Sequence, residues 1–135
     1  MALYMLDTDI CSYIIKDRPQ QVYQHFAKHD MADICISMVT YAELNYGVEK
    51  SSSSKINSDV IAKFVAHLTI VPWDEDAAEC YGSVRAVLER RGTPIGAVDM
   101  MIAAHAKSLD ITLVTNNQKH FNKVAGLKLE NWMEN

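Results

Sequence analysis

The sequence predicts an α/β fold, a three-layer α/β/α sandwich around a central, mainly parallel sheet. Short apolar runs that end at polar residues are typical of buried strands, and they occur at 3–6, 34–36, 69–71 and 111–114, with a weaker run at 127–129. Segments with a helical spacing of apolar residues separate these runs. Strands that alternate with helices are joined by crossovers, so we expect parallel strands with helices on both faces.

Two helices can be placed from the spacing of their apolar residues. The first is expected at 59–68 and the second at 74–91. The second has natural boundaries, because Asp74 is a good N-cap and Gly92 a good stop. The serines at 51–54 predict a loop between two helices. The apolar residues that carry the periodicity are Val60, Ile61, Phe64, Val65 and Leu68 in the first helix, and Ala77, Tyr81, Val84 and Leu88 in the second.

Length and composition indicate one domain, at 1–135, in a reducing compartment. A chain of 135 residues is long enough for one packed core and too short for two ordinary domains. No apolar run approaches the ~20 residues of a membrane helix, and the N-terminus has no signal-peptide pattern, so we expect a cytoplasmic protein without a membrane partner. Cys11, Cys35 and Cys80 are widely spaced and odd in number, which favours free thiols. Neither they nor the histidines show the spacing of a zinc site.

The charge balance excludes a protein that holds nucleic acid by a broad basic surface. Thirteen Lys and Arg residues against seventeen Asp and Glu residues give a formal net charge of -4. A broad nucleic-acid surface would instead require an excess of basic residues. If RNA is the substrate, local basic residues and a bound metal ion must therefore offset the repulsion.

Two carboxylates follow the first predicted strand. Asp7 and Asp9 come directly after the apolar run at 3–6. In open parallel sheets, ligands bind beyond the carboxyl ends of the strands, so these side chains are expected at the ligand crevice. The alternative is that one of them only caps the helix that follows.

Glu43 and Asp99 are the next candidates. Glu43 stands three residues after Thr40, which is the spacing of a capping box, so it is either the glutamate of such a box or a functional acid. Asp99 is the only formally charged residue in the apolar stretch 95–106, which predicts a buried carboxylate on a helix. A buried carboxylate must be paired, capped or coordinated to a cation, and the sequence leaves these alternatives open.

Asn117 follows the predicted strand at 111–114, again at a carboxyl end. Its amide oxygen can bind Mg²⁺, although Asn at such a position also forms turns and helix caps. Carboxylates and an amide gathered in one crevice suit Mg²⁺, which binds oxygen ligands and keeps several waters. Such an ion activates water and stabilises the charge on a phosphate that is being cleaved, so the pattern favours phosphodiester hydrolysis.

The chain resembles the PIN-domain ribonucleases, and among them the VapC toxins of bacterial toxin–antitoxin systems. The resemblance covers nearly the full length. It is carried by MLDTDI at 5–10, SMVTYAELNYG at 37–47, RRGTPIGAVDMMIAAHA at 90–106, LVTNN at 113–117 with Phe121, and LKLENW at 127–132.

This resemblance implies a PIN-like fold with a catalytic site formed by Asp7, Glu43, Asp99 and Asn117, in which Asp7 and Asp99 bind Mg²⁺ or Mn²⁺. Asp9 stands where relatives commonly carry Asn, and Asn117 stands where many carry Asp. We therefore expect one metal ion, or a second one held through water. The activity that the resemblance implies is endonucleolytic cleavage of structured RNA, commonly a tRNA. It also implies inhibition by a VapB-type antitoxin and a homodimer.

Two other functions fit parts of the same pattern. Asp7-Thr8-Asp9 after a strand imitates the nucleophile motif of haloacid dehalogenase-type phosphotransferases, in which Asp7 would form an acyl-phosphate. That chemistry also requires a lysine and a paired-acid motif in fixed order on a longer chain. The second alternative is a non-catalytic binding module, in which the candidate ligands are only helix caps.

Overall fold

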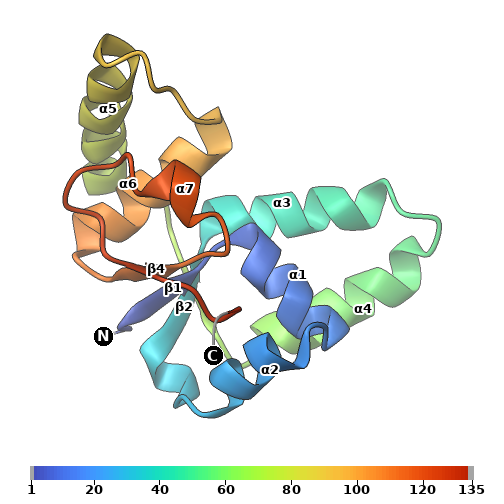
Figure 1. The fold of residues 1–135 in the computed structure, drawn as a ribbon. Coiled ribbons are helices and arrows are strands. Elements are labelled where there is room, and N and C mark those ends of the chain that lie inside the picture. Colours follow the sequence, from blue (N-terminus) through green and yellow to red (C-terminus); the bar gives the residue numbers. More distant parts are fainter. Residues whose placement is uncertain (1, 134–135) are drawn as a thin grey trace.

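The fold is built around one parallel β-sheet. The structure, a computed structural model, describes residues 2–133. Within that range, five strands lie in the order β3-β2-β1-β4-β5, and each paired neighbour runs parallel (Figure 1). They are β1 (Tyr4–Leu6), β2 (Ile34–Ser37), β3 (Thr69–Val71), β4 (Thr112–Val114) and β5 (Leu129–Glu130). The predicted strands are thus confirmed, with β5 slightly later in the chain than expected.

Helices cover both faces of the sheet, which confirms the three-layer arrangement (Figure 1). The sheet separates two hydrophobic cores. Successive side chains of β1 point to opposite faces, so Leu6 packs into one core and Met5 into the other. None of the described helices is long and apolar enough to cross a membrane. The core of Leu6 is covered by α1 (Thr8–Lys16), α2 (Gln20–Ala27), α3 (Met38–Glu49) and α4 (Ser54–Val65), and the core of Met5 by α5 (Glu75–Arg90), α6 (Ala97–Leu109) and the short α7 (Gln118–Phe121).

Local signals set the ends of α5 but only part of α4. The Asp74 side chain accepts a hydrogen bond from the backbone N–H of Ala77 and caps α5, while Gly92, with a φ of 69°, follows the helix end, so both predictions are confirmed. The helix expected at 59–68 is α4, and it starts and ends earlier. Its first turn is exposed, including the apolar Ile56, so no buried apolar stripe marks it in the sequence.

The carboxyl ends of three central strands meet at one edge of the sheet. The parallel register pairs Leu6 of β1 with Ile36 of β2 and with Val114 of β4. The chain leaves these strands into α1, α3 and the segment before α7, and Figure 1 shows α6 beginning near the same place. This edge therefore collects residues that are far apart in the sequence, as expected for the ligand crevice of such a sheet.

Candidate active site

Asp7 is a buried carboxylate with two roles. It is only 5% exposed, and its Oδ1 accepts a hydrogen bond of 2.8 Å from the backbone N–H of Ile10, so it caps α1. Burial raises its pKa from 3.8 to about 7, and Asp9 and Asp99 add to that rise, while hydrogen bonds from Thr115 and Ile10 oppose it. Capping is therefore confirmed, but it does not exclude a functional role, because the cap leaves the charge without a counter-charge.

Asp99 lies in the first turn of α6, beside the same edge of the sheet. The sequence predicted a buried side chain. Asp99 is only half-buried, because it lies at the exposed N-terminal end of a helix whose middle is buried. It is not the cap of α6, since Gly96 holds that position. Burial raises its pKa, His120 lowers it, and Asp9 and Glu43 raise it further. These mutual effects place Asp99 close to the other acids.

Glu43 does not belong to a capping box. The cap of α3 is Ser37, whose Oγ accepts a hydrogen bond of 3.1 Å from the backbone N–H of Val39. Glu43 is therefore in the second turn of α3, half-buried, and it faces a cavity of about 500 Å³ between α1, α3 and α4 that Thr8 also lines. A capping box therefore does not explain why Glu43 is present at this position.

Asn117 connects to Asp7 through Thr115. The backbone N–H of Asn117 donates to Thr115 Oγ1 at 2.9 Å, and the Thr115 side chain is hydrogen-bonded to Asp7. Asn117 occupies the N-cap position of α7, but its side chain does not cap the helix. Its Nδ2 instead lies 3.0 Å from Nδ1 of His120. A turn therefore explains the backbone hydrogen bond of Asn117 but not the position of its side chain.

The structure gathers the predicted acids and adds neighbours that the sequence did not single out. Asp7, Asp99 and Glu43 lie close enough for electrostatic coupling, directly or through Asp99, and Asn117 joins them by hydrogen bonds. His120 was given no role, although its place three residues after Asn117, one helical turn on, was the available signal. Thr8, Thr115 and the exposed Asp9 also adjoin this group.

The oxygen atoms of these carboxylate and hydroxyl side chains are of the chemical type that binds a hard divalent cation such as Mg²⁺. The raised pKa values of Asp7 and Asp99 show that a cation would stabilise their ionised forms. The buried Thr8 Oγ1 has no hydrogen-bond partner among the described residues. Between residues 2 and 133, no three His, Cys, Asp or Glu side chains converge closely enough to enclose an ion by themselves. Because Mg²⁺ keeps several waters and is commonly held by one or two carboxylates, an open arrangement is compatible with it.

Comparison with known proteins identifies the family. The PIN domain model matches residues 4–127. The tRNA(fMet)-specific endonuclease VapC of Shigella flexneri is 43% identical over 132 residues, which cover 98% of this chain and 99% of the relative. The crystal structure of DNA-bound VapBC from Salmonella typhimurium contains a chain that is 39% identical, with a TM-score of 0.92 over 98% of this chain and 99% of that one. VapBC2 from Rickettsia felis, bound to a promoter fragment, matches at 40% identity and a TM-score of 0.87, over 96% and 98% of the two chains.

The fold is that of a PIN-domain nuclease. The match spans nearly all of the described sheet, and the relatives match over almost their full lengths. The chain belongs to the PIN-domain family, in its VapC ribonuclease branch. The family resemblance, the fold class and the enzyme class predicted from the sequence are thereby confirmed.

Proposed function

We propose that this VapC ribonuclease cleaves structured RNA, a tRNA, at the crevice formed by Asp7, Glu43, Asp99 and Asn117, with Mg²⁺ or Mn²⁺ as its cofactor. The observation that carries the proposal is the buried Asp7, whose pKa of about 7 reflects a carboxylate without a counter-charge beside two other acids. A purely structural cap would not require those acids nearby. The family membership supports ribonuclease chemistry at this place.

Asp7 and Asp99 are the residues that would hold the ion. Asp7 is fixed by the hydrogen bonds from Ile10 and Thr115, and Asp99 is fixed by the first turn of α6. A bound divalent ion supplies Lewis acidity, which makes water a stronger nucleophile and offsets the charge on the phosphate. Glu43 lies on α3 near enough to Asp99 to raise its pKa, and its carboxylate could orient the attacking water and accept its proton. The amide of Asn117 could orient bound groups without adding negative charge.

Cleavage is expected to require Mg²⁺ or Mn²⁺ and to leave a 5′-phosphate. The reason is that the proposed nucleophile is water, so the 2′-hydroxyl of the RNA takes no part. The measurement is cleavage of tRNA(fMet) with and without EDTA, followed by mapping of the product ends. Full activity in EDTA, or a 2′,3′-cyclic phosphate at the cut, would contradict this mechanism.

The relatives suggest the substrate and the partner. The Shigella flexneri relative is a tRNA(fMet)-specific endonuclease, and the matching structures from Salmonella typhimurium and Rickettsia felis are VapBC complexes. We therefore propose a tRNA substrate and a VapB-type antitoxin for this chain, and we keep the homodimer that the family resemblance implies as a further part of the proposal. The cavity next to Glu43 is partly apolar, and the exposed hydrophobic side chains Tyr46 and Val60 are among its lining residues, which supports coverage by a protein partner.

Expression of this chain alone in bacteria is expected to arrest growth, and co-expression of its antitoxin is expected to restore growth. Cleavage of an essential RNA stops translation, and the antitoxin prevents access to the crevice. The measurement is colony formation and growth rate after induction, with Asp99→Asn as the control that should not arrest growth. Normal growth in the presence of folded, metal-loaded protein would count against the toxin assignment.

Membership of the PIN-domain family replaces the phosphotransferase interpretation of Asp7. The binding-module interpretation makes a separate prediction, because a module would keep its biological effect after Asp99→Asn. The growth assay above therefore distinguishes the two.

A further inference from the structure

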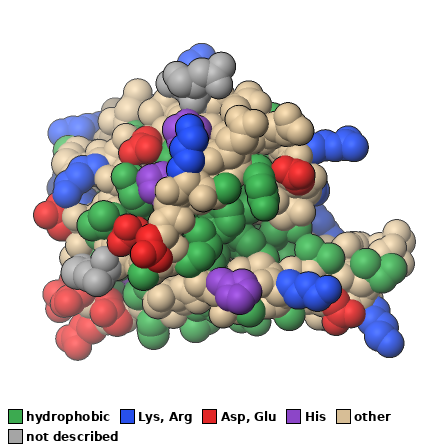
Figure 2. Space-filling model, turned by 90° about the horizontal axis from the view of Figure 1, so that it is seen from below, with side chains coloured by type: hydrophobic (Ala, Val, Ile, Leu, Met, Phe, Trp, Pro, Cys, Tyr) green, Lys and Arg blue, Asp and Glu red, His purple; other side chains and the backbone are tan. Residues whose placement is uncertain are grey.

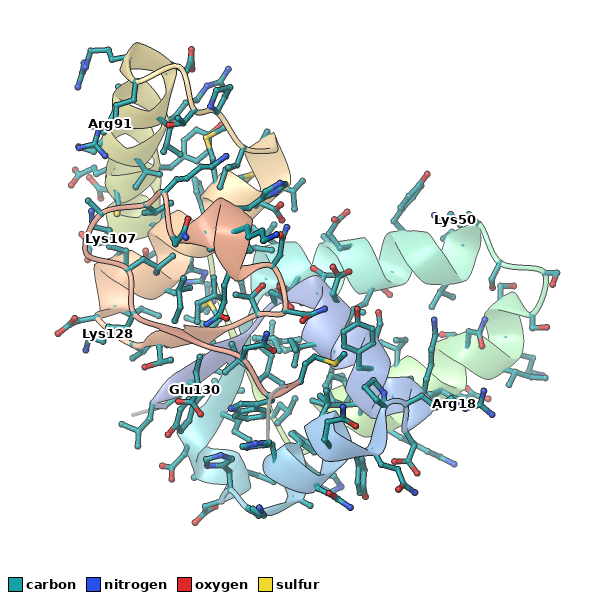
Figure 3. All side chains as sticks on the ribbon, in the orientation of Figure 1. Arg18, Lys50, Arg91, Lys107, Lys128 and Glu130 are labelled. Atoms are coloured by element: carbon teal, nitrogen blue, oxygen red, sulfur yellow. The ribbon has the colours of Figure 1, made fainter. Side chains whose placement is uncertain are left out.

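The basic residues of this chain are dispersed, with Lys16 and Lys50 lining the cavity beside Glu43 and Lys119 next to His120 on α7. Figure 3 shows Arg18, Lys50 and Arg91 near the C-terminal ends of α1, α3 and α5, where a cation complements the helix dipole. On the face in Figure 2, hydrophobic side chains gather in the middle and Lys and Arg side chains are scattered, most of them near the edge. The ionised forms of Asp7 and Asp99 repel an RNA phosphate, so a hydrogen-bond donor beside these acids would help to bind it.

His120 is placed to be that donor. It is exposed on α7, and its Nδ1 lies 3.0 Å from Nδ2 of Asn117. Because an amide nitrogen can only donate, Nδ1 is the acceptor and the ring proton is on Nε2. The same contact uses the amide nitrogen of Asn117 and leaves its Oδ1 free to accept. With this pairing, Nε2 of His120 presents an N–H donor that none of the hydrogen bonds described for residues 2–133 uses.

The ring also lies at the crevice rather than beyond it. Of the side chains that shift the pKa of Asp99, His120 is the one that lowers it, so its ring lies near that carboxylate. Hydrogen bonds hold His120 in a continuous chain that runs from Asp7 through Thr115 and Asn117. The side chain is therefore connected to the acidic group although it is exposed to solvent.

We propose that His120 is a substrate-binding residue of this site, whose Nε2–H donates a hydrogen bond to a phosphate oxygen of the RNA beside the scissile bond. The inference rests on the proposed function, because it assigns the RNA to the same crevice. It gives the acidic site a local group that attracts phosphate, which the net charge of -4 does not provide. The rival explanation is that the Asn117–His120 contact only closes the first turn of α7.

Kinetics of the variants His120→Ala and His120→Gln separate these explanations. With tRNA(fMet) and Mn²⁺, we expect His120→Ala to raise KM about tenfold, the loss of one hydrogen bond to a charged group, with kcat within about twofold. His120→Gln keeps a donor near the position of Nε2 and should recover most of the loss. Affinity for Mn²⁺ alone, measured by calorimetry, should not change in either variant. The matched control is His67→Ala, because His67 is exposed and lies beyond the end of α4.

Direct binding of tRNA(fMet) in EDTA separates failure of this inference from failure of the proposed function. If wild-type protein binds the RNA and His120→Ala binds it about tenfold more weakly, the inference holds even when no cleavage is seen. Equal RNA affinity in the wild type and the His120→Ala variant overturns it, as does a lower melting temperature with unchanged KM, which would indicate the turn-closing role. Loss of Mn²⁺ affinity would also overturn it, since His120 would then act on the metal site. A wild-type protein that neither binds nor cleaves tRNA(fMet) overturns both proposals.

Discussion

Asp7→Asn is expected to lower the cleavage rate more than about a hundredfold and, at the same time, to raise the free energy of unfolding of the metal-free protein at pH 8. The substitution keeps the shape of the side chain and an oxygen that can accept from Ile10, so the cap of α1 survives. It removes a carboxylate that is only 5% exposed and has no counter-charge. Function and stability should therefore move in opposite directions.

The pH dependence of stability gives the sign of this effect. The pKa of Asp7 rises from 3.8 to about 7 on folding, chiefly because of burial, so the folded state binds more protons than the unfolded state between these values. Below pH 3.8 the side chain is neutral in both states and there is no penalty. As pH rises through about 7, metal-free wild-type protein should lose up to about 4 kcal/mol of stability that the Asn variant keeps.

Urea denaturation in EDTA at pH 5 and pH 8 measures the larger part of this difference, about 3 kcal/mol, because Asp7 of the unfolded state is already ionised at pH 5. The control is Asp59→Asn, which removes an exposed carboxylate from α4, outside the crevice, and should leave the pH dependence close to that of the wild type. An Asn variant at position 7 that is less stable at pH 8, or that still cleaves RNA, would contradict the assignment of Asp7 to the metal.

Local sequence signals predicted the ends of a helix correctly where a single capping residue is enough to define each end. Asp74 and Gly92 fixed the ends of α5 because a capping carboxylate and a glycine with positive φ act within their own turn. Glu43 misled the same kind of reasoning. The box pattern after Thr40 was present, but Ser37 at the end of β2 caps α3 first, and the position of that strand end depends on the whole sheet.

The sequence was sufficient to propose which residues form the candidate site, but not the hydrogen bonds that connect them. Parallel strands with Asp7 and Asn117 at their carboxyl ends could be inferred from the alternation of strands and helices. The strand order that makes β1 and β4 neighbours is known only from the structure. The hydrogen-bonded path from Asp7 to Asn117 passes through Thr115, whose side-chain direction no periodicity reveals. For the same reason the sequence offered capping and metal binding as alternatives for Asp7, whereas the structure permits both at once.

Asp99→Asn is expected to abolish cleavage without lowering the stability of the metal-free protein. Gly96 holds the cap position of α6, and none of the salt bridges found between residues 2 and 133 includes Asp99, so Asn breaks neither a cap nor an ion pair. Burial together with Asp9 and Glu43 raises the pKa of Asp99, which means that its neutral form is favoured despite the attraction of His120. The favourable interaction of Asp99 with the helix dipole, about 0.3–1 kcal/mol, works in the other direction and limits the gain.

Thermal melts with and without Mn²⁺, run beside a cleavage assay, separate this role from a structural one. In wild-type protein the ion binds only the folded state, so saturating Mn²⁺ should raise the melting temperature. In Asp99→Asn that rise should largely disappear, while the melting temperature in EDTA stays equal to or slightly above that of the wild type. A structural Asp99 would give the reverse, with a loss from about 1 kcal/mol for a cap to several for a broken buried pair. A variant that melts much lower in EDTA yet still cleaves RNA would remove Asp99 from the active site, and the metal would then lose one of its two proposed ligands.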